Sequence, residues 1–323
     1  MTHDTEKNNL SLIIPENYAL ERLDLVLSKL LPDYSRTQLQ DWIEAGQVLL
    51  NNQPTKTKTK VKGGEIVSIH VTLKPQPEWV AQDLPLNIVH EDEALIIINK
   101  AVGMVVHPGA GNADRTLLNA LLHHAPSLKD LPRAGILHRL DKDTSGLLVI
   151  AKTPAALRSL SSQLKKRSLL REYQAIVYGS FISGGKVDVA IARHHLLRKR
   201  MAVNEMGKPA ITHYRIAEKF PHLTLLTVRL ETGRTHQIRV HMNHIQHPIV
   251  GDVIYGGRVK LSKNMTPELI AALRQFKRQA LHAFALGLTH PITGEWMRFE
   301  IDLPQDMQQL LLALRQDKAH NKA

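Results

Sequence analysis

The sequence predicts an α+β protein with a small N-terminal domain and a larger C-terminal domain. Its predicted helices and strands intermix without the regular strand–helix–strand order of a doubly wound sheet. Its 323 residues are enough for two domains. A stretch rich in proline and polar residues separates two differently patterned segments. We therefore expect a disordered N-terminus at 1–17, a small domain at 18–75, a linker at 76–85, a large domain at 86–316 and a polar tail at 317–323.

The small domain is predicted to contain two helices followed by a hairpin. The first helix begins near Leu20, carries leucines at helical spacing and ends at Pro32. Ser35 is the expected N-cap of a second helix, which Gly46 terminates. Short strands are expected after it, at residues 48–50 and 65–69.

The larger domain is predicted to contain strands at residues 94–98, 147–151, 172–178 and 223–230. Residues 147–151 are apolar without alternation, which indicates a strand buried on both faces. Helices are expected over 117–122, from Thr153, from Gly233 to about 244, from Thr266 and from Pro304. At Thr153 and Thr266 a capping residue precedes proline, the preferred first helical residue.

Composition favours a polyanionic partner. The formal net charge is +12, and residues 1–75 hold nine Lys/Arg and nine Asp/Glu, so the excess lies downstream. Basic clusters at 165–167 and 198–200 are either phosphate contacts or plain solvated surface. Only 4% of residues are aromatic, which favours recognition of RNA shape and phosphate over stacking on single strands.

Some classes of site are excluded or disfavoured. The chain has no cysteine, which excludes disulfides and cysteine-based metal or redox sites. Its start has no apolar signal segment and no apolar run reaches membrane-spanning length, so we expect a cytoplasmic protein without a membrane partner. His241, His244 and His247 are spaced for one helical face and could bind a metal. Because the chain has 18 histidines, chance explains this spacing better and no metal site is expected.

The nine residues HRLDKDTSG at 138–146 precede the buried strand directly. Charged groups in such a place are costly unless they pair or take part in chemistry. One interpretation is a turn with an ordinary ion pair; the other is an active-site loop.

This motif resembles the active-site signature of the RluA-type pseudouridine synthases. Further blocks of the same resemblance follow in order: INK at 98–100, VHPG at 106–109, REY at 171–173, TGRTHQIRVH at 232–241, QALHA at 279–283 and HP at 290–291. The resemblance implies a central, mostly antiparallel mixed sheet and an enzyme that isomerises uridine in RNA without a cofactor. The small domain resembles an S4-type RNA-binding module.

The resemblance also assigns site residues. Asp141 matches the family's catalytic aspartate, and Arg239 matches its basic partner, with Arg234 as the competing candidate. A guanidinium beside a buried carboxyl favours the ionised form. Arg139 would fill the space left by an extruded nucleotide or hold that nucleotide, and Tyr173 would stack on the uracil. The plain alternatives are a structural ion pair for Arg139 and a core position for Tyr173.

The expected partner is 23S rRNA or a precursor of the large ribosomal subunit, bound by a monomer. The residues expected to contact RNA are basic: Arg36, Lys56, Lys58, Lys60, Lys62, Lys165, Lys166, Arg167 and Arg234.

Two other functions fit parts of the sequence. Asp141-x-Asp143-Thr144 resembles the nucleophile motif of haloacid-dehalogenase phosphatases, but there the apolar strand comes before the first aspartate. A non-catalytic RNA-binding protein of ribosome assembly fits the charge and the S4-like module equally well. The combination of Asp141, Arg239 and Tyr173 favours the enzyme over both.

Overall fold

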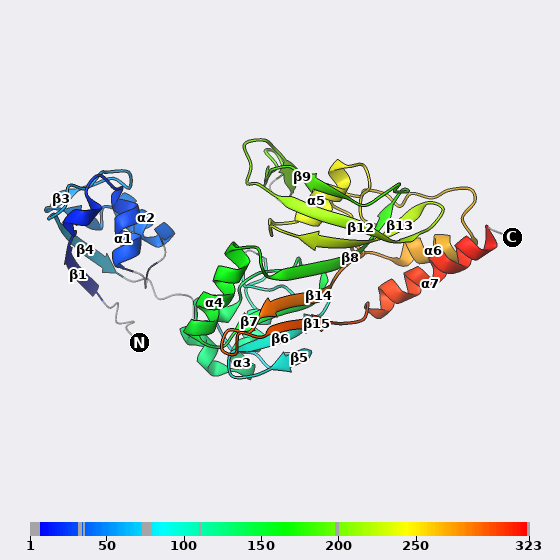
Figure 1. Cartoon of the computed structure of the whole chain (residues 1–323), viewed down its shortest axis with the longest axis horizontal. Coiled ribbons are helices and arrows are strands. Elements are labelled where there is room, and N and C mark those ends of the chain that lie inside the picture. Colours follow the sequence, from blue (N-terminus) through cyan, green and yellow to red (C-terminus); the bar gives the residue numbers. More distant parts are fainter. Residues whose placement is uncertain are drawn as a thin grey trace. The chain divides into compact units, whose positions relative to one another are not determined.

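The computed structural model describes residues 7–31, 34, 36–72, 79–109, 111–197 and 200–321 (Figure 1). The chain divides into two compact units, Met1–Glu78 and Trp79–Ala323. The expected helix end at Pro32, the cap at Ser35, the linker residues 76–78 and the basic residues at 198–199 lie outside the described residues.

The N-terminal unit contains two helices and a four-stranded sheet. The helices are α1 (Leu23–Leu30) and α2 (Arg36–Glu44). The sheet has the order β1-β4-β2-β3, formed by β1 (Lys7–Ile13), β4 (Ile66–Thr72), β2 (Val48–Leu50) and β3 (Gln53–Pro54). The predicted helix pair and hairpin are therefore present. Their apolar faces form one core, which includes Leu23, Leu27, Leu39 and Trp42.

Two expectations for this unit were wrong. Residues 7–13 are not disordered, because β1 pairs antiparallel with β4 along its whole length. Helix α1 begins at Leu23 rather than Leu20, since Leu20 has a left-handed φ of 70° that a helix cannot continue. A short 3-10 turn at Glu16–Tyr18 precedes it.

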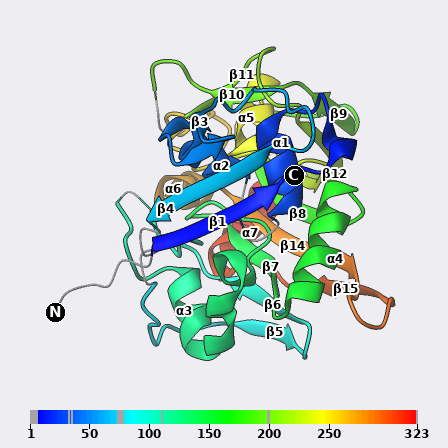
Figure 2. The same cartoon turned by 90° about the vertical axis from the view of Figure 1, so that its left-hand side faces the viewer.

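The C-terminal unit is built on a nine-stranded sheet with the order β5-β6-β7-β14-β8-β13-β12-β9, and β15 pairs with β14 (Figures 1 and 2). All its strand pairs are antiparallel except β7 with β14. The predicted α+β class with a mostly antiparallel sheet is confirmed. The strands are β5 (Ile88–Glu91), β6 (Leu95–Lys100), β7 (Ser145–Ala151), β8 (Leu170–Tyr178), β9 (Gly185–Asp188), β12 (Ile211–Lys219), β13 (Leu223–Leu230), β14 (Leu281–Thr289) and β15 (Trp296–Glu300).

Both faces of the central strands are covered. Every residue of β7 is buried, with Leu148 and Ile150 in the main core and Leu147 and Val149 in a second core that α4 helps to form. This two-sided burial explains why the strand lacks polar alternation. A separate two-stranded hairpin pairs β10 (Ile191–Arg193) with β11 (Met201–Val203).

Five α-helices flank the sheet: α3 (Leu117–His124), α4 (Pro154–Lys165), α5 (Gln237–His244), α6 (Pro267–Gln275) and α7 (Gln305–His320). Short 3-10 segments lie at Pro126–Asp130 and Pro132–Gly135. The predicted caps are confirmed, because the Thr153 and Thr266 side chains accept the N–H groups of Ala156 and Leu269. Across the described ranges, none of the helices combines the length and apolar character that crossing a bilayer requires.

The predicted ends of the large domain were also wrong. Residues 79–85 belong to this unit, because Trp79 packs on the main core and the Asn119 side chain donates to the Val80 carbonyl. Residues 317–320 continue α7 rather than forming a tail. Asp317 is buried there and accepts the N–H of Thr266.

Candidate active site

The HRLDKDTSG motif forms a tight loop that leads into β7. The Asp141 carbonyl accepts the N–H of Thr144 at 3.1 Å, which closes the turn. The Nζ of Lys100, on β6, donates to the Lys142 carbonyl at 3.0 Å and to two further carbonyls. From the other side, Arg278 Nη1 donates to the Asp143 carbonyl at 3.2 Å. Lys100 and Arg278 therefore fix the backbone that carries Asp141.

Lys100 is 1% exposed, and burial lowers its pKa to about 8. The three carbonyls match the three donors of an ammonium group. Gln279 adds a further contact, donating to the Thr144 hydroxyl at 3.0 Å. The loop is thus held through its backbone, which leaves the Asp141 side chain free for other contacts.

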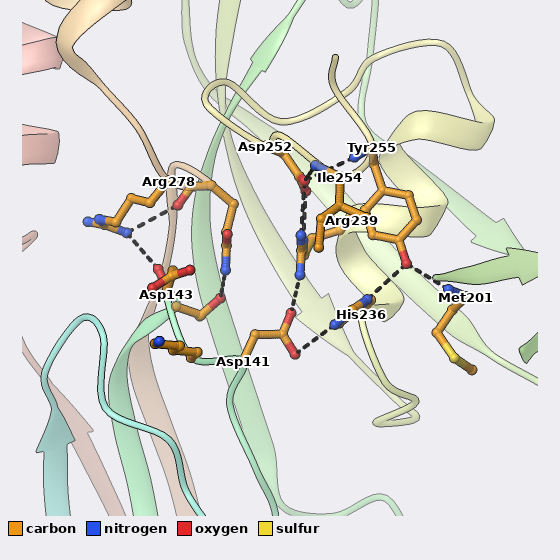
Figure 3. A network of polar contacts seen from close by, with 12 residues as sticks. Asp141, Asp143, Met201, His236, Arg239, Asp252, Ile254, Tyr255 and Arg278 are labelled. Carbon is orange, nitrogen blue, oxygen red and sulfur yellow. Dashed lines mark hydrogen bonds and ion pairs between the residues drawn. The ribbon is translucent and has the colours of Figure 1, made fainter. Parts of the chain in front are cut away.

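A single guanidinium joins two aspartates at the start of α5 (Figure 3). Arg239 Nη1 donates to Asp141 Oδ2 at 2.9 Å. Its Nε and Nη2 donate to the two oxygens of Asp252 at 2.6 and 2.9 Å. The predicted partner Arg239 is therefore in place. The competing candidate Arg234 is exposed, and its Nε donates to the Pro209 carbonyl instead.

Asp252 was not predicted as a site residue. It is 2% exposed and also accepts the N–H groups of Ile254 and Tyr255 at 3.0 Å. Burial alone would lower the pKa of Arg239, but its bonds to Asp252 and Asp141 outweigh this and raise it. Asp252 therefore anchors the arginine, and one guanidinium donor remains for Asp141. Sequence spacing gives no signal for it, because it lies in a loop outside the matched motifs.

Asp141 lines a cleft of about 900 Å³ in the C-terminal unit. Its side chain is 17% exposed, so it is partly shielded yet accessible from the cleft. Tyr173, on β8, also lines the cleft and is 5% exposed, and burial raises its pKa. Arg139 is exposed at the cleft wall. The structure thus brings together Asp141, Arg239, Tyr173 and Arg139, the four residues predicted for the chemistry.

Two further residues complete the polar network around Asp141. His236, the N-cap residue of α5, places its Nε2 3.8 Å from Asp141 Oδ1. Its Nδ1 lies 2.8 Å from the Tyr255 hydroxyl (Figure 3). The ring of Tyr255 lies 5.1 Å from the Arg239 guanidinium, within cation–π range. His236 is part of the matched TGRTHQIRVH block, so sequence could have marked it, whereas nothing in the sequence marked Tyr255.

Of the predicted basic RNA contacts in this unit, Lys165, Arg167 and Arg234 line the cleft. Lys166 is the exposed C-cap residue of α4 and is not among the lining residues. Arg167 pairs with Glu231 at 2.7 Å, so part of its charge is already balanced. Two further arginines that were not predicted as RNA contacts also line the cleft, Arg133 and Arg171, the latter from the REY block.

In the N-terminal unit the four predicted lysines are exposed. Lys56, Lys58, Lys60 and Lys62 follow β3, and each is separated from the next by a residue that is at least partly buried. All four charges are therefore open to solvent. Arg36 is different, because it donates twice to the fully buried Asp24, at 2.6 and 3.0 Å. Its guanidinium is therefore mainly an ion-pair partner inside the unit.

Among the residues that the structure describes, no three His, Asp or Glu side chains are grouped to hold a metal ion. His241 is fully buried, 2.9 Å from the Thr212 hydroxyl and 3.1 Å from the Val189 carbonyl. His247 Nδ1 donates to the Tyr178 carbonyl at 2.7 Å. The periodic histidines thus have separate structural contacts. The phosphatase motif also fails structurally, because β7 follows Asp141 instead of preceding it.

Comparisons with known proteins show which family the chain is similar to. The model of the RNA pseudouridylate synthase family matches residues 94–244, and that of the S4 domain matches residues 21–67. The chain is 49% identical, over 100% of its length and 99% of the relative's, to the ribosomal large subunit pseudouridine synthase D of Vibrio cholerae. It is 51% identical to the Escherichia coli K12 protein of the same name, over 98% of each chain.

Among solved structures, human RNA pseudouridylate synthase domain containing 4 superposes with a TM-score of 0.57 at 27% identity, covering 71% of this chain and 93% of that chain. Human RNA pseudouridylate synthase domain containing 1 gives a TM-score of 0.51 at 26% identity, covering 73% of this chain and 96% of that chain. These two bacterial relatives align with nearly the whole chain at about 50% identity, so the similarity is not confined to the motifs. The chain belongs to the RNA pseudouridylate synthase family and carries an S4 domain in its N-terminal unit.

Proposed function

We propose that this chain isomerises uridine to pseudouridine in large-subunit ribosomal RNA, acting as a monomer in the cytoplasm. The observation that carries the proposal is the carboxylate of Asp141, held in the cleft by Arg239 at 2.9 Å. The substrate class comes from relatives of about half identity, which are named ribosomal large subunit pseudouridine synthases.

The reaction breaks the bond between N1 of uracil and C1′ of ribose, and forms a bond between C5 and C1′. C5 loses a proton and N1 gains one, so the product is an isomer and no electrons are exchanged. Such a rearrangement needs a group that attacks the sugar or base, or that removes a proton. Asp141 supplies this carboxylate, and Arg239 holds one of its oxygens by a charged hydrogen bond of 2.9 Å in a partly shielded cleft.

The target nucleotide must leave its stack to reach this cleft, at a cost of a few kcal/mol. Tyr173 offers a buried aromatic face beside Asp141, suited to stacking on uracil. Arg139 is exposed at the wall, where its guanidinium can fill the space of the extruded base or hold it. Lys165, Arg167 and Arg234 add positive charge for the flanking phosphates.

The S4 domain adds affinity through phosphate contacts. Its exposed lysines at positions 56, 58, 60 and 62 present four charges to solvent. Such contacts are independent of base sequence and fix position on the RNA. The substrate is ribosomal RNA, free or in a large-subunit precursor.

The test is Asp141→Asn in cells otherwise lacking the protein, with pseudouridines mapped across the ribosomal RNA. The amide keeps the shape but has no negative charge, so we expect RNA binding to persist and the modification to stop. A variant that modifies RNA at the native rate would refute the role of Asp141. The non-catalytic alternative predicts that the wild-type chain itself restores no pseudouridine.

A further inference from the structure

The Asp141 carboxylate has one oxygen bound and one facing an imidazole. Oδ2 accepts from Arg239, whereas Oδ1 faces His236 Nε2 at 3.8 Å (Figure 3). His236 has a left-handed backbone, with φ 55° and ψ 19°, and its side chain makes no capping bond to α5. A non-glycine residue in this conformation is strained. The strained residue thus delivers its ring to the cleft rather than to the helix end.

The hydrogen bonds of Tyr255 determine which nitrogen of His236 carries the proton. The Tyr255 oxygen accepts the backbone N–H of Met201 at 2.8 Å. Its own hydrogen then points to His236 Nδ1, 2.8 Å away, so Nδ1 is the acceptor. In the neutral ring the proton is therefore on Nε2, the nitrogen that faces Asp141. The opposite tautomer would direct a lone pair at a carboxylate.

Burial favours the neutral ring of His236. Burial lowers its pKa, and so do the guanidinium groups of Arg239 and Arg139, against the opposing effect of Asp141 and Asp252. Burial also raises the pKa of Tyr255, which keeps its proton on the hydroxyl. The chain Met201–Tyr255–His236 thus ends in a neutral N–H directed at the free oxygen of Asp141.

We propose that His236 is a positioning residue that orients the second oxygen of Asp141 through its Nε2–H, and that Tyr255 fixes the tautomer required for this. The inference rests on the proposed function, since it concerns the same carboxylate. Arg239 and His236 would then hold one oxygen each, so that the plane of the carboxylate is set before the nucleotide enters. The 3.8 Å separation shortens to a hydrogen bond when substrate fills the cleft.

Two isosteric replacements separate this role from packing. Asn keeps a polar atom near the position of Nδ1 and tolerates a left-handed backbone, whereas Gln places its amide near the position of Nε2. The substrate is ribosomal RNA from cells lacking the protein. We expect His236→Asn to lower kcat roughly 10- to 100-fold, with KM and RNA affinity unchanged. His236→Gln should stay within roughly a factor of ten of wild type.

Tyr255→Phe keeps the ring that packs on Arg239 and removes only the hydroxyl. We expect it to lower kcat but to have no further effect in the His236→Asn background, because the proton that it places is then absent. Independent effects of the two substitutions, or a His236→Asn enzyme with native kcat, would overturn the proposal. An equal loss of kcat in His236→Asn and His236→Gln would also overturn the proposal.

These outcomes are distinct from failure of the proposed function. If wild-type protein forms no pseudouridine in this RNA, the function itself is wrong. If the wild-type protein is active, Asp141→Asn is inactive and His236→Asn has the native kcat, then only the positioning role of His236 is wrong. Unfolding temperature and RNA affinity, measured for each variant, identify any loss that comes from misfolding.

Discussion

Arg239 makes three charged contacts from one planar group, a task that lysine cannot perform. Its fork donates twice to Asp252 and once to Asp141. An ammonium group could satisfy one of these aspartates but would leave the other without its partner. The choice of arginine is therefore dictated by the geometry of the two carboxylates.

We expect Arg239→Lys to lower kcat by roughly 100-fold while the affinity for RNA changes little. Single-turnover pseudouridine formation and filter binding measure the two quantities. Arg234→Lys is the matched control in the same cleft, because Arg234 has no bond to Asp141. A larger loss of kcat in the control would contradict the assignment.

Asp24 makes the stability of the S4 domain sensitive to acid. Its carboxyl is fully buried, and although burial opposes ionisation, bonds from Arg36, Arg22 and Gln40 lower its pKa from 3.8 to about 2. A lowered folded-state pKa gives stability that is present above pH 4 and lost as the pH falls toward 2. The difference between these two pKa values of Asp24 corresponds to about 2 kcal/mol of unfolding free energy.

Trp42 lies in the core of this unit and reports its unfolding when Trp79 and Trp296 are replaced by Phe. In that background, we expect the urea midpoint of the Trp42 transition to fall between pH 4 and pH 2. Asp24→Asn should lower the midpoint at pH 7 and remove this pH dependence. An Asn variant that retains the acid-induced loss would show that another carboxyl causes it.

At the scale of elements, helix α7 supports the loop that carries Asp141. Asp306, in its first turn, accepts from Arg278 Nε and Nη2 at 2.6 and 2.8 Å, and Arg278 in turn donates to the Asp143 carbonyl. Arg278 is 8% exposed. Removing the partner of a buried guanidinium leaves its charge uncompensated.

We expect Asp306→Asn to lower the unfolding free energy by about 1–2 kcal/mol and to reduce kcat, because Arg278 is buried whereas the Asp306 side chain is 43% exposed. Glu218→Gln is the control, because Glu218, on β12, pairs with Arg315 of α7, a guanidinium that is 56% exposed, whereas Arg278 is 8% exposed. Such a surface pair contributes about 0–1 kcal/mol. Urea unfolding and pseudouridine formation test both variants; equal effects would contradict the support role of Asp306.

Sequence predicted the elements with strong local signals and missed those formed through pairing. The apolar run before Ala151 and the Thr–Pro caps depend on neighbouring residues, and both are confirmed. Strand β1 was missed because its polar sequence becomes a strand only through pairing with β4, more than 50 residues away. The contact between Asp141 and Arg239 could be predicted only from the family motifs. Asp252 and Tyr255 could be predicted neither from local sequence signals nor from those motifs, because the contacts of these two residues depend on tertiary position.

At the scale of the whole molecule, the two units have separate cores and contribute different terms to RNA binding. The C-terminal unit contains the cleft, and the S4 domain carries four exposed lysines. Each phosphate neutralised by a cation releases counterions, so binding weakens with salt in proportion to the number of contacts.

We expect log affinity to fall less steeply with log salt concentration when Lys56, Lys58, Lys60 and Lys62 are all replaced by Gln in the full chain. The magnitude of this slope should decrease by up to about 3. The reaction rate at saturating RNA should not change, because these residues lie outside the unit that holds Asp141. Lys29→Gln is a control, since Lys29 is paired with Glu21. An unchanged salt slope would exclude the four lysines from RNA binding.

The position of β14 has a consequence for how the enzyme matures. This strand, from the last fifth of the chain, lies between β7 and β8, next to the loop of Asp141 and the strand of Tyr173. Gly146 permits the insertion, because a Cβ there would lie 2.3 Å from the Ala283 carbonyl oxygen. A nascent or truncated polypeptide that lacks β14 cannot join β7 to β8, so the loop of Asp141 and the strand of Tyr173 are not brought together. We therefore expect competence to modify RNA to arise only after residues 281–289 have been synthesised and paired.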